Sequence, residues 1–531
     1  MLFNSYAFIF LLLPFAVGGY YACRHYLGYR TALLWLVLSS LIFYGAWDWR
    51  YVLLICGSAL FNFYTAQGII GLRRGAGSAR PRALLAFGIA ANLCLLGYYK
   101  YLNFFVDNLN LLIETDIFIQ QIVLPIGISF FTFQQIAYLV DCYRREASDY
   151  SLISYLTFVT FFPQLIAGPI VHHKEMMPQF QAPDRLPLSY NNISCGVIIF
   201  TIGLFKKVII ADQMALLATP VFQVADLGGA VTLLDAWIGV LAYTFQIYFD
   251  FSGYSDMAVG LALLFNVHLP VNFYSPYKAT SIIDFWRRWH ITLSRFLRDY
   301  LYIPLGGNRG GEPRRYVNIM VTMVLGGIWH GAGWTFLVWG TLHGFYLVIN
   351  HLWRGLTGGG EGGGLVARWG GRLLTFLLVV VAWAFFRAET LPGALQVVGG
   401  MAGMNGISVD PAGFLRPLAR IAWLDVRLEG DIVFGLWGVV QLAGCLAFVW
   451  LLPNTYQLLA GESWISRLAQ RLRLLRALLP GAQKALRDLY AARVYYPLLY
   501  PTALAAPLAA AAFYGVISLL NKPSEFIYFQ F

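Results

Sequence analysis

Apolar residues dominate long segments of the chain, and short polar stretches separate these segments. The first five segments cover residues 6–23, 32–47, 51–71, 83–99 and 121–140, and the later ones cover 152–167, 192–217, 231–249, 254–267, 316–329, 333–350, 372–387, 432–452 and 502–520. A helix needs about 20 mostly apolar residues to cross a bilayer. The pattern therefore predicts an all-α fold, a polytopic transmembrane helical bundle with about nine to thirteen spans.

Several segments in the middle of the chain are too short for a full crossing. Irregular backbone at membrane depth is tolerated only where protein or a water-filled cavity surrounds it. These segments therefore predict re-entrant helices around a buried site.

The number of Lys and Arg residues alternates between successive loops. The counts after the first five segments are two (Arg24, Arg30), one (Arg50), four (Arg73, Arg74, Arg80, Arg82), one (Lys100) and two (Arg144, Arg145). Basic loops stay preferentially in the cytoplasm. The alternation therefore predicts that the N-terminus lies outside the cytoplasm, as do the loops that hold Arg50 and Lys100.

Composition excludes an ordinary soluble enzyme, because 59% of the residues are hydrophobic and only 12% are charged. The formal net charge of +11 fits cytoplasmic loops rich in Lys and Arg, so we expect no nucleic-acid partner. Residues 461–495 add seven basic residues interleaved with leucines. They predict an interfacial helix on anionic membrane lipid, with a binding surface for a cytosolic partner as the alternative.

Ionisable residues in apolar segments are candidates for function because a bilayer makes them costly. His330 lies in LGGIWHGAGWTFLVWG, where glycines let a backbone or a ligand approach closely. An imidazole suits proton transfer near neutral pH. His330 is therefore a candidate catalytic base, and a buried histidine that only links two helices by a hydrogen bond is the alternative.

His290 lies in the segment DFWRRWHITLSRFLRDYLYIPLGGNRGG. Helical spacing puts Trp286, His290, Leu293 and Leu297 on one face, which predicts a continuous amphipathic helix with the histidine on its aromatic face. Residues 278–315 contain eight basic residues and three acids, so this region should lie at the cytoplasmic surface. Its arginines could grip the phosphates of a coenzyme A thioester or could simply meet lipid headgroups.

The segment YFDFSGYSDMAVGLALLF places Asp250 and Tyr254 four residues apart, so each could support the other on a helix. The six cysteines form no C-x-x-C pair, and no run of histidines and carboxylates has metal-ligand spacing. Neither G-x-S-x-G, Walker A nor H-E-x-x-H occurs. We therefore predict no metal site, and readings as a serine hydrolase or a phosphate-driven pump lose support.

Four strings together carry a family resemblance. They are PIGISFFTFQQIAYLVD (125–141), FFPQLIAGPIV (161–171), the region from FDFSGYSDMAVGLALLF to DFWRRWHITLSRFLRDYLYIPLGGNR (249–309), and GGIWHGAGWTFLVWGTLHG (326–344). The chain resembles the membrane-bound O-acyltransferase family, in its bacterial branch of alginate O-acetyltransferases, related polysaccharide acetylases and teichoic-acid D-alanyl transferases. The C-terminal FIYFQF resembles the alginate type.

The resemblance implies a helical bundle with re-entrant helices around a central tunnel, in the bacterial inner membrane. It implies that His330 is catalytic and that His290 is a second functional position, which other branches replace with asparagine. The expected substrate-binding residues are Trp286, Arg287, Trp289, Arg298, Arg309, Asp250 and Tyr254. We expect no tightly bound cofactor, acetyl-coenzyme A as the acyl donor, and a periplasmic acetyltransferase or acetyl-carrier protein of a polysaccharide export complex as partner.

The resemblance also implies a division of the chain into N-terminal helices (1–120), a catalytic core (121–400) and C-terminal helices (401–531). The acceptor stays open at this point, because acetylation of alginate, acetylation of cellulose and D-alanyl transfer share these motifs. A proton-coupled transporter is the alternative from another class, since many spans with intramembrane Asp and His also describe a carrier.

Overall fold

The computed structural model describes residues 1–74, 80–146, 150–181, 188–358, 364–408, 426–427, 436–459, 505–517, 520 and 526–527. These residues are overwhelmingly helical, as the apolar pattern predicted. A single parallel pair, β1 (Ile407–Ser408) and β2 (Val426–Arg427), is the extended structure among them. The predicted interfacial helix at 461–495 lies outside the described residues.

The chain divides into two compact units. The first comprises Met1–Phe205, Tyr254–Val271 and Thr455–Phe529. The second comprises Lys206–Gly253, Asn272–Asn454 and Gln530–Phe531. The helix α12 (Leu233–Leu264) gives its residues up to Gly253 to the second unit and the rest to the first. The division at residues 120 and 400 stays a prediction.

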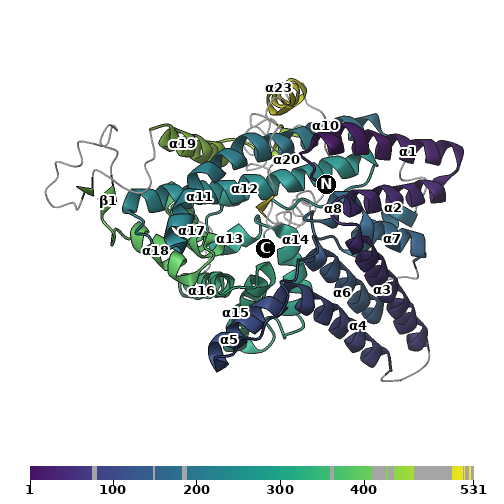
Figure 1. Ribbon diagram of the computed structural model, residues 1–531, viewed down its shortest axis with the longest axis horizontal. Helices are drawn as coiled ribbons and strands as arrows, with labels where there is room; N and C mark the ends of the chain where they lie inside the picture. Colours follow the sequence, from purple (N-terminus) through teal and green to yellow (C-terminus); the bar gives the residue numbers. More distant parts are fainter. Residues whose placement is uncertain are drawn as a thin grey trace. The chain divides into compact units, whose positions relative to one another are not determined.

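The described residues of the first unit are mostly helical. Its elements are η1 (Ala7–Leu12), α1 (Leu13–Tyr26), α2 (Tyr29–Gly45), α3 (Arg50–Arg74), α4 (Arg80–Leu96), η2 (Gly97–Tyr101), α5 (Leu102–Ile113), α6 (Ile128–Arg144), α7 (Leu152–Thr160), α8 (Phe162–Leu165), α9 (His173–Gln181), α10 (Tyr190–Phe205), α20 (Thr455–Leu459) and α23 (Ala505–Ile517). Within it, α3, α4 and α6 lie side by side (Figure 1).

A buried polar network joins these three helices. Asn62 of α3 donates hydrogen bonds to Asn92 of α4 at 3.1 Å and to Gln135 of α6 at 2.6 Å. Ser58, one turn before Asn62, donates to the same Gln135 oxygen at 2.7 Å. Away from water, such amides are costly unless they are paired, so the network fixes how the three helices pack.

The second unit contains α11 (Asp212–Asp226), α13 (Ile282–Trp286), α14 (Ile291–Leu297), α15 (Gly311–His330), α16 (Trp334–Leu356), α17 (Leu365–Arg387), α18 (Leu391–Met401) and α19 (Leu436–Leu451), with the short turns η4 (Lys206–Ala211), η5 (Pro276–Lys278) and η6 (Arg298–Tyr302). Within this unit, α15 packs along α16, and α17 packs against α16 (Figure 1).

The helix bounds differ from the predicted segments in two informative places. The segments 231–249 and 254–267 were expected to be separate, but α12 runs through both without a break. Asp250, which lies between the two segments, is paired with Lys207 at 2.7 Å, so its charge is balanced within the helix. The segment 121–140 becomes helical only at Ile128, after Pro125 and Gly127.

Membrane character is visible in the surfaces of the helices. Among the described residues, five helical stretches are long and apolar enough to cross a bilayer: Ala7–Tyr26, Arg50–Arg73, Arg80–Ile113, Tyr190–Asp226 and Leu365–Arg387. Large apolar side chains are exposed on them, including Leu11 at 71% and Leu53 at 69%. Such surfaces suit contact with lipid tails, and the chain is a multi-pass membrane protein. The count of nine to thirteen spans stays a prediction.

Candidate active site

His330 is the last residue of α15, and close helix packing sets its position. A Cβ atom on Gly327 would lie 2.4 Å from the carbonyl oxygen of Phe336, and one on Gly340 would lie 2.5 Å from that of Met323. Both distances are shorter than real Cβ atoms show, so only glycine fits at this seam between α15 and α16. The seam holds the two helices, and the short turn after His330, in one arrangement.

An aromatic cage surrounds the imidazole of His330, which is 4% exposed. Its ring centre lies 4.9 Å from Trp329, 5.1 Å from Trp339 and 5.2 Å from Phe386. Aromatic rings exclude water without offering a counter-charge, so the imidazole is held in a dry, apolar setting.

His290 approaches the same cage, because its ring centre is 6.4 Å from that of His330. The predicted continuous helix through His290 is wrong: α13 ends at Trp286, and α14 begins at Ile291. The backbone of His290 is left-handed, with φ of +42°, and this residue caps α14. His290 therefore lies at a helix break and is fully buried beside His330, whereas the prediction placed it on the face of a continuous helix.

Backbone hydrogen bonds to the segment 272–274 stabilise the break. The backbone N–H of Ile291 donates to the carbonyl of Asn272 at 3.0 Å, and that of Tyr274 donates to Arg288 at 2.9 Å. Arg288 before the break and Ile291 at the start of α14 are therefore paired through backbone hydrogen bonds, which satisfies groups that the broken helix would otherwise leave open.

The side chain of Asn272 sets the tautomer of His290. Its Oδ1 accepts from the backbone N–H of Thr292 at 3.3 Å and from the Thr292 hydroxyl at 2.9 Å. The same oxygen lies 3.1 Å from Nδ1 of His290. An amide oxygen only accepts, so Nδ1 must carry the proton, and the lone pair of the neutral ring is on Nε2. Sequence analysis missed Asn272, because no motif spacing links it to His290.

His343 forms a second histidine position beside the cage and is fully buried. Its ring centre lies 4.8 Å from Trp339 and 5.2 Å from Trp286, and it stacks on Phe285 at 6.2 Å. Trp339 therefore contacts both His330 and His343. The sequence showed His343 in apolar surroundings but gave no reason to place it beside His330.

The two predicted tryptophans join this cluster. The ring centre of Trp286 lies 6.0 Å from that of Trp339, and the ring centre of Trp289 lies 5.0 Å from that of Trp383. Trp383 in turn lies 5.2 Å from Phe386 of the His330 cage. The structure therefore brings Trp286, Trp289, His290 and His330 into one continuous aromatic cluster.

The predicted phosphate-gripping arginines lie at the surface. Arg287, Arg298 and Arg309 are exposed, and Arg298 pairs with Asp299 at 2.7 Å. Two further arginines gather near Arg287: Arg315 donates a hydrogen bond to Nδ1 of His351, and Arg354 lies close by. Burial, together with the charges of these three arginines, lowers the pKa of His351 to about 4.

The structure assigns Asp250 and Tyr254, which the spacing placed together, to different units. Asp250 is 1% exposed and pairs with Lys207, which also contacts Asp212 at 2.9 Å. Its chain neighbour Phe251 contacts the ring of His290 at 4.8 Å. Tyr254 lies in the first unit, where it stacks on Phe3 at 5.0 Å. Sequence analysis missed Lys207, because its partner is 43 positions away along the chain.

The geometry suits proton transfer in a water-poor setting. His330 and His290 offer two imidazoles, and the protonation of one is fixed by its partner Asn272. Comparison with known proteins gives this geometry a chemical context, because the model of "MBOAT, membrane-bound O-acyltransferase family" matches residues 83–358, more than half of the chain. The chain belongs to the membrane-bound O-acyltransferase family. It is therefore an O-acyltransferase.

Relatives extend the match over most of the chain. A peptidoglycan O-acetyltransferase of Helicobacter pylori is 46% identical over 438 residues, which cover 77% of this chain and 81% of the relative. The probable alginate O-acetylase AlgI of Pseudomonas aeruginosa is 44% identical over 412 residues, 76% of this chain and 75% of the relative. A teichoic acid D-alanyltransferase of Lacticaseibacillus rhamnosus is 26% identical over 369 residues, which cover 66% of this chain and 86% of the relative. The family decides against the transporter alternative.

Proposed function

We propose that this O-acyltransferase moves acetyl groups from a cytosolic donor, acetyl-coenzyme A, to a polysaccharide outside the inner membrane. One observation carries the proposal: two histidines lie 6.4 Å apart in a buried aromatic cage of a chain from this family. The acceptor polymer is a bacterial polysaccharide, either an exopolysaccharide such as alginate or peptidoglycan. The names of the relatives support both.

The imidazole of His330 acts as the general base in this proposal. A sugar or protein hydroxyl is a weak nucleophile, so it needs a base that takes its proton while its oxygen attacks the thioester carbonyl. The new ester bond forms, the carbon–sulfur bond breaks, and the coenzyme A thiolate leaves and regains the proton. The dry aromatic surroundings of His330 exclude water that would otherwise hydrolyse the thioester.

His290 positions the reactants. With its proton fixed on Nδ1, its Nε2 can accept a hydrogen bond from the attacking hydroxyl or from a bound water. The surface arginines Arg287, Arg315 and Arg354 would hold the donor phosphates, because planar guanidinium groups bind phosphate in a bidentate manner. A periplasmic acetyltransferase or acetyl-carrier protein would receive the acetyl group and pass it on to the polymer.

The decisive variant is His330→Ala in the full chain, with His25→Ala as the matched control, because His25 is exposed in α1. Both proteins are purified in detergent, and transfer of radiolabelled acetyl from acetyl-coenzyme A is measured. We expect His330→Ala to lose at least about a hundredfold in rate, the contribution of a general base, while the control keeps the wild-type rate. Retained transfer in His330→Ala, with normal insertion and yield, would overturn the assignment.

A further inference from the structure

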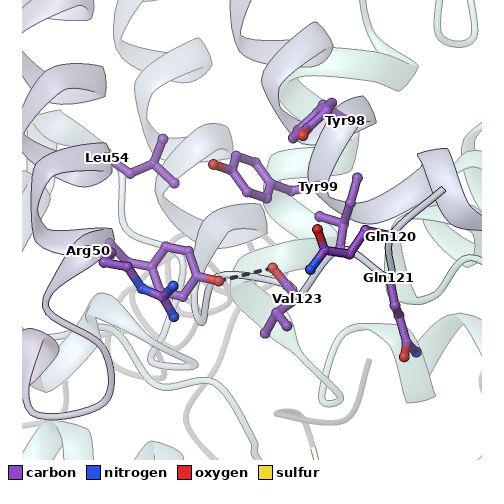
Figure 2. Close-up of a pocket in the computed structure, with 9 residues that line it drawn as sticks. Arg50, Leu54, Tyr98, Tyr99, Gln120, Gln121 and Val123 are labelled. Carbon is purple, nitrogen blue, oxygen red and sulfur yellow. Dashed lines mark hydrogen bonds between the residues drawn. The ribbon is translucent and has the colours of Figure 1, made fainter.

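A pocket of about 410 Å³ opens in the first unit (Figure 2). Its lining includes Arg50 and Tyr51 at the start of α3, Tyr98 and Tyr99 in η2, and Gln120 with Gln121 in the segment before α6. The volume falls within the roughly 300–1,000 Å³ that small-molecule sites occupy. The loops that carry Arg50 and Lys100 are those that the charge pattern places outside the cytoplasm.

The walls of this pocket are held in place before any ligand binds. The hydroxyl of Tyr51 donates to the carbonyl of Val123 at 3.2 Å, which fastens the segment before α6 to α3 (Figure 2). Further along α3 from Tyr51, the network of Ser58, Asn62, Asn92 and Gln135 joins α3, α4 and α6, the helices that carry or follow the lining segments. A preformed pocket binds with little ordering cost.

The lining matches the chemistry of a sugar ring. Three tyrosines provide apolar ring faces with polar edges, on which the C–H face of a pyranose can stack. In Figure 2, the ring of Tyr99 and the amide of Gln120 both point into the space between Arg50 and Leu54 on one side and the segment of Gln120 and Gln121 on the other. A primary amide both donates and accepts hydrogen bonds, as sugar hydroxyls require.

The charge of the pocket is balanced. Arg50 is the charged residue in the lining, and its guanidinium forms a two-pronged pair with Asp48, with Nε to Oδ1 at 3.0 Å and the second nitrogen to Oδ2 at 2.6 Å. These hydrogen bonds lower the pKa of Asp48, so the carboxylate stays ionised. An anion such as a lipid phosphate or a uronate would have to compete with Asp48 for Arg50.

We propose that this pocket binds an uncharged pyranose ring of the acceptor glycan on the outward face of the membrane. The proposal rests on the proposed function, in which a periplasmic acetyl-carrier protein passes the acetyl group on to the polymer, and a pocket on this chain would hold that polymer beside the carrier. It narrows the acceptor to a glycan of neutral hexose or N-acetylhexosamine units. A purely structural aromatic belt at the lipid headgroups is the competing explanation.

The test uses the full chain in lipid nanodiscs and saturation-transfer NMR with an N-acetylglucosamine tetramer as probe. We expect binding to weaken roughly fivefold or more in Tyr99→Ala and in Gln120→Ala, which follows from about 1 kcal/mol per ring contact or hydrogen bond. Tyr99→Phe keeps the ring and should bind within about twofold of wild type. Tyr64→Ala is the matched control. Tyr64 is a tyrosine of the same unit, in α3, but it is 63% exposed and is not part of the pocket lining.

The proposal is overturned by any of the following results: no saturation transfer to the tetramer, equal binding in Tyr99→Ala and wild type, or binding of a mannuronate tetramer in preference to the uncharged probe. Displacement of the probe by short-chain phosphatidylglycerol would also overturn it and assign the pocket to lipid. His330→Ala separates this proposal from the proposed function. It should still bind the tetramer while it loses acetyl transfer, so either idea can fail without the other.

Discussion

Replacing Gly340 with alanine tests whether the close approach of α15 and α16 positions His330. The added Cβ would lie 2.5 Å from the carbonyl oxygen of Met323, which is 0.9 Å short of the 3.4 Å at which ordinary contact begins. The neighbour is backbone in the middle of a helix, so it cannot swing aside. The helices must separate by a large part of that distance, and the cage around His330 moves with them.

The size of the effect differs between stability and activity. Overpacking costs about 1–3 kcal/mol, and the better helix propensity of alanine returns about 1 kcal/mol, so the net loss of stability is small. A displacement of about 1 Å at a reacting group costs roughly a hundredfold in rate. We therefore expect Gly340→Ala to fold with a slightly lower Tm while its acetyl transfer falls by about one to two orders of magnitude.

The assay pairs thermal unfolding in detergent with radiolabelled acetyl transfer. Gly355→Ala is the matched control, because Gly355 belongs to the same helix and a Cβ there meets no atom within 4 Å. It should keep the wild-type rate and gain slightly in Tm. If Gly340→Ala keeps the wild-type rate, the seam does not position His330, and the reasoning is refuted.

Three further predictions concern buried polar groups and orientation. Lys207→Met removes the cation that pairs with the buried Asp250 carboxylate, so the free energy of unfolding should fall by about 3–5 kcal/mol and Tm should fall sharply. Adding Asp250→Asn to the same chain should partly restore Tm, and an unchanged Tm in Lys207→Met would contradict the prediction. Asn272→Leu leaves the donors of His290 and Thr292 unpaired, so both Tm and transfer rate should fall, and wild-type values for both would count against the tautomer argument. In a cysteine-free background, Trp49→Cys should react with an impermeant maleimide in intact cells and Arg145→Cys only after lysis, whereas the reverse pattern would invert the predicted orientation.

The helical fold and the position of His330 could be predicted because both leave local signals in the sequence. Long apolar segments predict helices through a single physical requirement, the thickness of the bilayer. A histidine framed by glycines in an aromatic stretch predicts a buried, closely packed imidazole. The cage of Trp329, Trp339 and Phe386 confirms that prediction.

The remaining features depend on contacts between distant residues. Lys207 and Asp250 pair across helices, and the sequence around each residue contains no signal that predicts the other. Asn272 reaches His290 from 18 positions earlier in the chain. The break of the helix at His290 was missed because the residue is neither glycine nor proline, the two residues that normally signal such a break.

The left-handed backbone of His290 limits which substitutions can test its chemistry. Histidine and asparagine are among the side chains that tolerate positive φ best, and these are the two residues that the family resemblance implies at this position. Alanine there adds about 1–2 kcal/mol of backbone strain to whatever chemistry it removes. A rate lost in His290→Ala would therefore mix conformation with catalysis. His290→Asn and His290→Gly keep the turn and isolate the imidazole, so in this enzyme alanine scanning gives its least interpretable answer beside the proposed catalytic base, His330.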